Sequence, residues 1–341
     1  MMKKLFLIIC LLVSTVCLAQ GGAGIASESE FKFINNLSYH KSMFDATAPL
    51  DYLKIPFGKE EKSVGGQDQD SLTEPYSYGV PWAFRMTGSG SVWILDSLNQ
   101  SLKLFKADGN VEKSFPLADY GKIVIDFAIA PDGSMAFLNN VDGFIYLTDA
   151  NGQKSGQIEG FAHARAIEFT PKGDLLVSHP IMQAVLRFSP AGEMTEQLVA
   201  DQSLSLFAAA NEQLFGLEIN DLDASLYLRT VASPAETLVL ARFPYTEKHP
   251  GVTYAGGEII GVDATGNIYL SLVACHEQGQ IYRERLYKCT ADGKILGELD
   301  ILTVPHLAPD LPRKRVVAPD GRIVAFYPEE ANYVLCTYMI P

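Results

Sequence analysis

Residues 88–111 read GSGSVWILDSLNQSLKLFKADGNV and contain two short apolar segments between turns that carry glycine. The segment VWILD follows the turn at Gly90, and the segment SLKLF leads into the turn at Gly109. Glycine readily takes the positive φ that tight turns require, and apolar runs of this length between turn residues are typical of buried β-strands. This stretch therefore predicts short antiparallel strands joined by tight turns.

The same arrangement of strand, turn and strand recurs along the chain. Besides WAFRMTGSGSVWILD (82–96), the copies are IDFAIAPDGSMAFLN (125–139), AIEFTPKGDLLVSH (166–179), a degenerate LFAAANEQLFGLE (206–218), IIGVDATGNIYLSL (259–272) and RVVAPDGRIVAFY (315–327). Their turn positions are Gly90, Gly133, Gly173, Glu212, Gly266 and Gly321, which lie 43, 40, 39, 54 and 55 residues apart. A period near 40 residues with four short strands per repeat predicts a β-propeller, and six repeats predict six four-stranded antiparallel blades.

A second turn in each repeat supports this reading. Gly109, Gly152 and Gly192 each follow the first turn of their repeat by 19 residues. In the fifth repeat Gly293 follows Gly266 by 27 residues, and the additional length surrounds CHEQGQ (275–280). We therefore expect that hairpin to be longer than its counterparts.

The two ends of the chain are predicted to meet. The sixth repeat ends at Pro341, soon after its third strand, whereas LDYLKIPF (50–57) is a strand candidate without a repeat of its own. Pairing these segments would complete the last blade and leave no open sheet edge. The propeller is thus expected to span residues 50–341, with 50–57 as its closing strand.

The stretch 88–111 resembles an NHL repeat, with VWILDSLN followed by KLF, and residues 79–341 resemble the six-bladed propeller superfamily more loosely. The resemblance extends to gluconolactonase-like and strictosidine-synthase-like propellers, and it implies the fold but no single activity. In the lactonase-type relatives the first blade opens with a glutamate metal ligand, followed by Gly-Pro and an aromatic residue. Here YSYGVPWAF (76–84) has the Pro-Trp but no glutamate, which weakens a metal-dependent lactonase reading.

The N-terminus carries the pattern of a secretory signal peptide. Lys3 and Lys4 precede an apolar run, and small residues precede the expected cleavage before Gln20. We therefore expect a signal peptide over 1–19, an N-terminal arm over 20–49 and a secreted or periplasmic protein. Acylation of Cys17 is disfavoured because Val16 stands where a small residue is expected.

Charge and cysteine content narrow the classes of partner. The chain has 27 basic and 40 acidic residues, a net charge of −13, which disfavours nucleic acid as a partner. Beyond the signal segment no apolar run is long enough to span a membrane.

The three cysteines outside the signal segment, Cys275, Cys289 and Cys336, lack zinc-type spacing and are expected to be buried free thiols.

Two sets of residues are expected to face the mouth of the central channel. The first set lies at the starts of the innermost strands and comprises Trp82, Asp126, Arg165, Glu258, Arg313 and Lys314. Its cations suit an anionic group, although the charges can instead pair with one another. The second set ends the second strand of successive repeats and comprises Asp96, Asn139, His179 and Glu218. These side chains suit a divalent cation, but strand-end capping, suggested by Asp96 and Asn99, is the favoured interpretation.

The sequence contains no recognised catalytic motif, such as GxSxG, a P-loop or HExxH. It therefore favours an exported binding module without a cofactor, acting on a small molecule or an extracytoplasmic protein through the channel mouth. Two alternatives stay open: a lactonase-like hydrolase or lyase with a metal at the mouth, and a structural subunit of a surface complex.

Overall fold

The computed structural model describes residues 47, 50–66, 80–121, 123–182, 184–199, 207–208, 214–220, 225–231, 239–244, 252–276, 281–301, 313–328 and 331–341. The chain divides into two compact units, Met1–Asp45 and Ala46–Pro341, and every described residue belongs to the second. The expected signal peptide (1–19) and nearly all of the expected arm (20–49) lie outside the described residues. In the described part no helix has the length and apolar character needed to cross a membrane.

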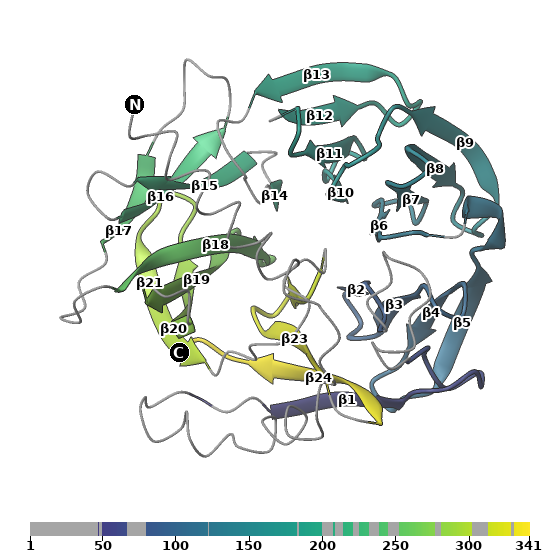
Figure 1. Cartoon of the computed structure of the whole chain (residues 1–341), viewed down its shortest axis with the longest axis horizontal. Helices are drawn as coiled ribbons and strands as arrows, with labels where there is room; N and C mark the ends of the chain where they lie inside the picture. The colour runs from purple at the N-terminus through teal and green to yellow at the C-terminus, as the bar shows by residue number, and fades with distance from the viewer. Residues whose placement is uncertain are drawn as a thin grey trace, which may run out of the picture. The chain divides into compact units, whose positions relative to one another are not determined.

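The described strands form six four-stranded antiparallel sheets arranged around a common centre (Figure 1). From the inside outward, the first three are β2 (Ala83–Met86), β3 (Val92–Asp96), β4 (Ser101–Phe105), β5 (Val111–Pro116); β6 (Asp126–Ile129), β7 (Met135–Asn139), β8 (Phe144–Thr148), β9 (Lys154–Glu159); and β10 (Ala166–Phe169), β11 (Leu175–His179), β12 (Ala184–Phe188), β13 (Met194–Val199). A short 3-10 helix, η2 (Ala118–Tyr120), follows β5.

The remaining sheets are β14 (Phe207–Ala208), β15 (Leu214–Asn220), β16 (Ser225–Val231), β17 (Val239–Pro244); β18 (Val252–Val262), β19 (Ile268–His276), β20 (Ile281–Cys289), β21 (Ile295–Ile301); and β22 (Arg315–Val317), β23 (Ile323–Pro328), β24 (Asn332–Tyr338), β1 (Leu50–Pro56). The prediction of an all-β propeller with four-stranded antiparallel blades is confirmed.

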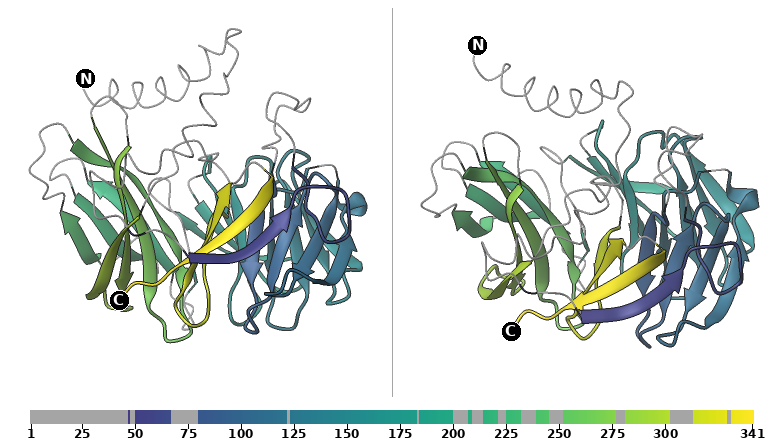
Figure 2. Two further views of the ribbon diagram at one scale, coloured as in Figure 1. Left: turned by 90° about the horizontal axis from the view of Figure 1, so that it is seen from below. Right: turned by 60° about the horizontal axis from the view of Figure 1, so that its bottom comes forward.

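Pairing of the chain ends is confirmed in the last of these sheets, the closing sheet. Strand β1 lies beside β24 (Figure 2). The two strands pair antiparallel, with Ile55 opposite Tyr333. Both side chains are buried within the same apolar cluster. An N-terminal strand therefore supplies the outer edge of a sheet that otherwise consists of C-terminal strands.

The predicted turn glycines all take the conformation that the sequence pattern requires. In the first turns φ lies between 83° and 91°, as at Gly90 and Gly321, and in the second turns it lies between 78° and 88°, as at Gly152 and Gly293. Residues other than glycine are strained there. The exception in the pattern, Glu212, lies outside the described residues.

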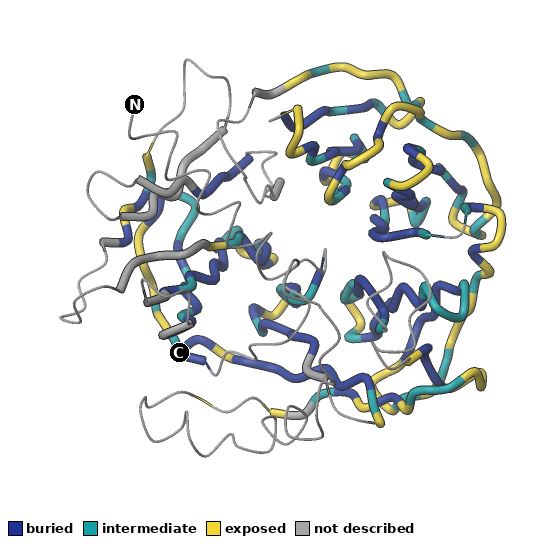
Figure 3. Tube along the Cα trace, viewed as in Figure 1, coloured by how far each residue is buried: buried dark blue, intermediate teal, exposed yellow. Residues whose placement is uncertain are grey.

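Burial follows the position of each strand in its sheet (Figure 3). All five residues of β3 and of β7 are buried, whereas the outer strands β5 and β9 are largely exposed. Apolar side chains fill the space between neighbouring sheets, as where Trp93 and Leu104 share a cluster with Phe127. Cys289 and Cys336 are buried free thiols, as expected; the side chain of Cys275 is outside the described part.

The irregularity predicted for the fifth repeat is located correctly, whereas the turn at Glu212 in the fourth repeat lies outside the described residues. In the fifth, β19 and β20 have nine residues each, against five in β3 and β4, which confirms a longer hairpin. Residues 277–280 at its tip are outside the described part.

Candidate functional site

The innermost strands begin at one end of the propeller, which we call the mouth end, and the first set of predicted residues lies there. Asp126 is the first residue of β6, and Arg165 and Lys314 directly precede β10 and β22. Glu258 differs, because β18 starts six residues before it. Trp82 is buried in the apolar cluster that also contains Phe84 and Ile125, so its ring serves packing.

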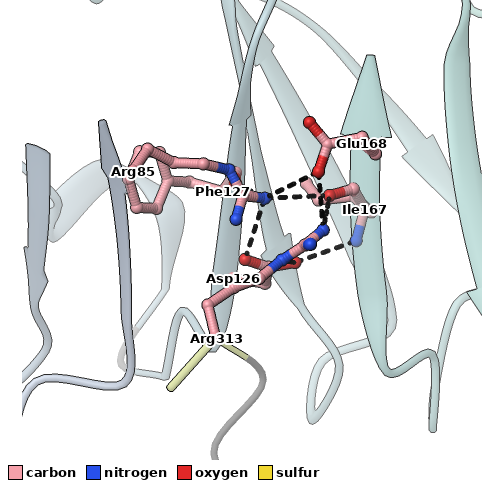
Figure 4. A network of polar contacts seen from close by, with 6 residues as sticks. All are labelled: Arg85, Asp126, Phe127, Ile167, Glu168 and Arg313. Carbon is pink, nitrogen blue, oxygen red and sulfur yellow. Dashed lines mark hydrogen bonds and ion pairs between the residues drawn. The ribbon is translucent and has the colours of Figure 1, made fainter. Parts of the chain in front are cut away.

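Four charged side chains from four sheets form an ion-pair network at this end (Figure 4). The carboxylate of Asp126 is fully buried, with Arg85 Nη2 3.3 Å from Oδ1 and Arg313 Nε 3.5 Å from Oδ2. Glu168 Oε2 lies 2.8 Å from Arg313 Nη2 and 3.5 Å from Arg85 Nη2. The ion-pair alternative is therefore confirmed for two predicted residues, Asp126 and Arg313.

Backbone groups complete the network and connect opposite sides of the ring. The N–H of Ile167 in β10 donates to Asp126 Oδ2 at 2.9 Å. The carbonyl of Ile167 accepts from Arg313 Nη2 at 2.8 Å and from Arg85 Nη2 at 3.1 Å. Arg313 belongs to the segment before β22, so this contact joins the closing sheet to the β10–β13 sheet.

Sequence reasoning missed Arg85 and Glu168. Both stand at the third position of a four-residue innermost strand, AFRM and AIEF. A charged residue inside a short, otherwise apolar strand is a signal, because burying an unpaired charge is strongly unfavourable. Two such strands with opposite charges would have suggested a buried pair. Arg85 also lies over the Phe127 ring, 5.4 Å from its centroid.

A second ion-pair cluster lies between the β18–β21 sheet and the closing sheet. Arg315 Nη1 lies 2.6 Å from Glu258 Oε1, and its Nη2 lies 2.5 Å from Glu284 Oε1. Glu284 is almost fully buried and accepts a hydrogen bond from the Ser271 hydroxyl at 2.6 Å. Glu258 is thus part of a charged cluster, but its partner is Arg315 rather than a residue of the predicted set.

Two cations of the predicted set form no ion pair or side-chain hydrogen bond within the described residues: Arg165, which is exposed, and Lys314, which is partly buried. Both act on Glu258 from a distance. Burial of Glu258 would raise the pKa of its carboxyl, but the positive charges of Lys314, Arg315 and Arg165 outweigh that effect and hold the pKa below its usual range. Arg165 and Lys314 therefore add positive charge at the mouth end beyond what the ion pairs neutralise.

The second predicted set, which ends the second strand of each repeat, caps the following turns. Asp96 Oδ1 accepts from the Asn99 N–H at 3.2 Å, and Asn139 Oδ1 accepts from the Asp142 N–H at 3.0 Å. His179 Nδ1 accepts from the Met182 N–H at 3.3 Å. The capping interpretation is confirmed for Asp96 and Asn139, and His179 makes a similar contact.

These three side chains belong to three different sheets. Asp96 also binds the Gly65 N–H at 2.9 Å, and Lys103 Nζ lies 3.3 Å from its Oδ2. The side chain of the fourth predicted residue, Glu218, lies outside the described part, as do residues 76–79 of the lactonase-like stretch. Among the side chains that are described, no three His, Cys, Asp or Glu residues gather in a way that suits a metal ion.

Comparisons with known proteins support the architecture only. No protein-family model and no curated protein sequence matches the chain. Hydrazine synthase of Kuenenia stuttgartiensis is a solved structure of similar fold, at 13% identity over 76% of each chain and a TM-score of 0.52. U3-55K is 13% identical over 86% of this chain and 100% of that chain, with a TM-score of 0.51.

Virginiamycin B lyase from Staphylococcus aureus is 13% identical over 84% of this chain and 99% of its own, with a TM-score of 0.48. The likenesses to hydrazine synthase and U3-55K, at TM-scores above 0.5, show a shared fold and nothing of the activity. The resemblance to NHL repeats stays a prediction.

Proposed function

We propose that this chain is an exported ligand-binding propeller, built of six NHL-like repeats, whose mouth end takes an anionic ligand. The observation that carries the proposal is the pair of cations at the mouth end, Arg165 and Lys314, which form no ion pair within the described part of the chain and act on Glu258 only from a distance. They stand out in a chain whose net charge is −13. An anion is the partner that such groups favour.

The contacts of Arg313 anchor the backbone segments that carry these cations. Arg313 adjoins Lys314, and its guanidinium is bound to the Ile167 carbonyl, two residues from Arg165. The backbone segments that carry Arg165 and Lys314 are therefore connected across the ring before any ligand arrives. Anchored backbone segments lose less conformational entropy when an anion binds than mobile segments would.

The test is calorimetric titration of the purified protein with acetate, butyrate and octanoate at low ionic strength. We expect Arg165→Gln and Lys314→Gln each to weaken carboxylate binding about tenfold, since a charge-assisted hydrogen bond contributes about 1.5 kcal/mol. Lys113→Gln removes the same charge from the exposed outer strand β5 and serves as the matched control. Equal affinities in wild type and both mouth-end variants would refute the proposal.

Turnover of the ligand separates the binding module from the enzyme alternatives. The compounds to test are lactones or esters of a carboxylate that binds. If wild type and Lys113→Gln cleave such a compound and the two mouth-end variants do not, the protein is a hydrolase or lyase rather than a simple binding module. Recovery of each compound unchanged supports the binding module.

Export is a separate part of the proposal and rests on the signal pattern of residues 1–19. N-terminal sequencing of the protein expressed from its full gene in a bacterial host should yield a mature chain that starts at Gln20. A cytoplasmic product that keeps the first 19 residues would refute export without affecting the binding proposal.

A further inference from the structure

Exposed apolar side chains lie in two loops that are linked by hydrogen bonds to the backbone at and next to Arg165. Val141, in the loop after β7, is 47% exposed, and Ile181 and Met182, in the loop after β11, are 68% and 46% exposed. Large apolar residues are among the most often buried types, so three exposed ones in two adjacent loops mark a surface that suits an apolar partner. We call Val141, Ile181 and Met182 the loop-tip residues.

Hydrogen bonds fix both loops beside Arg165. On one side, Asn140 Nδ2 donates to the carbonyl of Ala164 at 3.3 Å, so the loop of Val141 binds the residue directly before Arg165. On the other side, the N–H of Arg165 donates to the carbonyl of Ser178 at 2.9 Å. Ser178 directly precedes His179, whose Nδ1 accepts from Met182 and shapes the second loop.

The chain between these loops is held in an uncommon conformation. His163 has a φ of 71°, in the left-handed region, and its N–H donates to the carbonyl of Asn140 at 3.3 Å. A non-glycine residue in this region carries strain, and strained residues collect at binding and catalytic sites. The His163 side chain is exposed.

We infer that the anion bound at the mouth end carries an apolar chain: it is an amphiphilic carboxylate, with its head group on Arg165 and its chain against the loop-tip residues. This inference rests on the proposed function, because Arg165 supplies the charge for the head group. A guanidinium binds a carboxylate through two parallel N–H groups and leaves the rest of the ligand to lie along the neighbouring surface. The two loops belong to adjacent sheets, β6–β9 and β10–β13 (Figure 1).

Chain length gives the expected size of the effect. Full burial of one methylene raises the affinity about fourfold. A chain that lies on a surface keeps one side in water, so each methylene gains about half of that free energy, which raises the affinity roughly twofold. Octanoate has six more methylenes than acetate. We therefore expect octanoate to bind roughly 50-fold more tightly than acetate.

The experiment compares acetate, octanoate and octyltrimethylammonium by isothermal titration calorimetry, below the micellar range, in wild type and variants. The double variant Ile181→Ser, Met182→Ser should bring octanoate close to the affinity of acetate and leave acetate unchanged. Met194 is an exposed methionine on the outer strand β13, and Met194→Ser is the matched control that should change neither affinity. All three substitutions lie on the surface, where the fold tolerates them.

The outcomes separate this inference from the proposed function. If acetate and octanoate bind equally, the apolar part is wrong while anion binding stands. If octyltrimethylammonium binds as tightly as octanoate, the head group is not recognised by charge, and the amphiphilic carboxylate is overturned. If no carboxylate binds to wild type, the proposed function itself fails.

Discussion

Replacing Asp126 by asparagine isolates the charge that holds the mouth-end network together. Its carboxylate is fully buried and is shared between two guanidinium groups, those of Arg85 and Arg313. Burial and the nearby charge of Arg313 already lower the pKa of Arg85. In the Asp126→Asn variant the amide oxygen can still accept the hydrogen bond from Ile167, but among the described residues only Glu168 is left to form ion pairs with both arginines.

The expected loss of stability follows from the burial of the group. Removing one partner from a buried ion pair destabilises a protein by about 3–5 kcal/mol, because the remaining charge stays buried without compensation. The distances of 3.3 and 3.5 Å to the guanidinium nitrogens are long for strong charge-assisted bonds, and one hydrogen bond is kept. The lower end of the range, about 3 kcal/mol, is therefore expected for Asp126→Asn.

Equilibrium unfolding in urea, followed by tryptophan fluorescence, measures this loss. With an m-value of about 3 kcal/mol/M, the midpoint should fall by about 1 M. Asp119→Asn makes the same change on the exposed surface and should alter the free energy of unfolding by less than about 0.5 kcal/mol. Adding Arg85→Met to Asp126→Asn should recover part of the loss, since it removes a buried guanidinium. Equal midpoints for the Asp126 and Asp119 variants would refute the reasoning.

Three further predictions concern single side chains. Gly266→Ala should cost about 1–2 kcal/mol through its φ of 86° alone, whereas Gly321→Ala should cost more, because its Cβ would lie 2.5 Å from the Tyr269 hydroxyl; thermal unfolding of both variants tests the order. The pKa of Glu258 is lower in the folded state than its usual value of about 4.3, so its carboxylate stabilises the fold at any pH above that usual value. This contribution is lost as the pH falls through the lowered pKa of the folded state. The difference in unfolding free energy between wild type and Glu258→Gln, present at pH 7, should therefore shrink below about pH 4; a difference that stays constant to lower pH would contradict it. Burial raises the pKa of Cys289 to about 12, so a thiol reagent at neutral pH should modify it only after unfolding, as mass spectrometry of labelled peptides will report.

Much of the fold was predictable because it depends on local properties. The turn glycines at Gly133 and Gly173 take the positive φ expected of them, and the apolar segments between them form buried strands. Strand β1 was also predictable, since a last sheet lacking one strand and a lone strand at the other end leave one sensible pairing.

The candidate site was only partly predictable. Asp126 and Arg313 were expected at the mouth end because they lie seven and eight residues before the turn glycines of their repeats. The capping role of Asp96 followed from its spacing to Asn99. Which charges pair with which was not predictable, because the carboxylates that pair with Arg313, those of Asp126 and Glu168, belong to distant parts of the chain on other sheets. The role of Arg85 depends in the same way on a neighbouring sheet.

The sequence by itself determined the repeat, the strand order within each sheet and the closure of the chain ends, because turns and apolar periodicity act over a few residues. Only the tertiary structure decided how the charges at the mouth end are distributed. Ring formation brings Arg85, Asp126, Glu168 and Arg313 together from four sheets, and it leaves Arg165 and Lys314 without an ion pair in the described part. Electrostatic pairing depends on distances of a few ångströms between segments far apart in sequence, and packing of the sheets sets those distances.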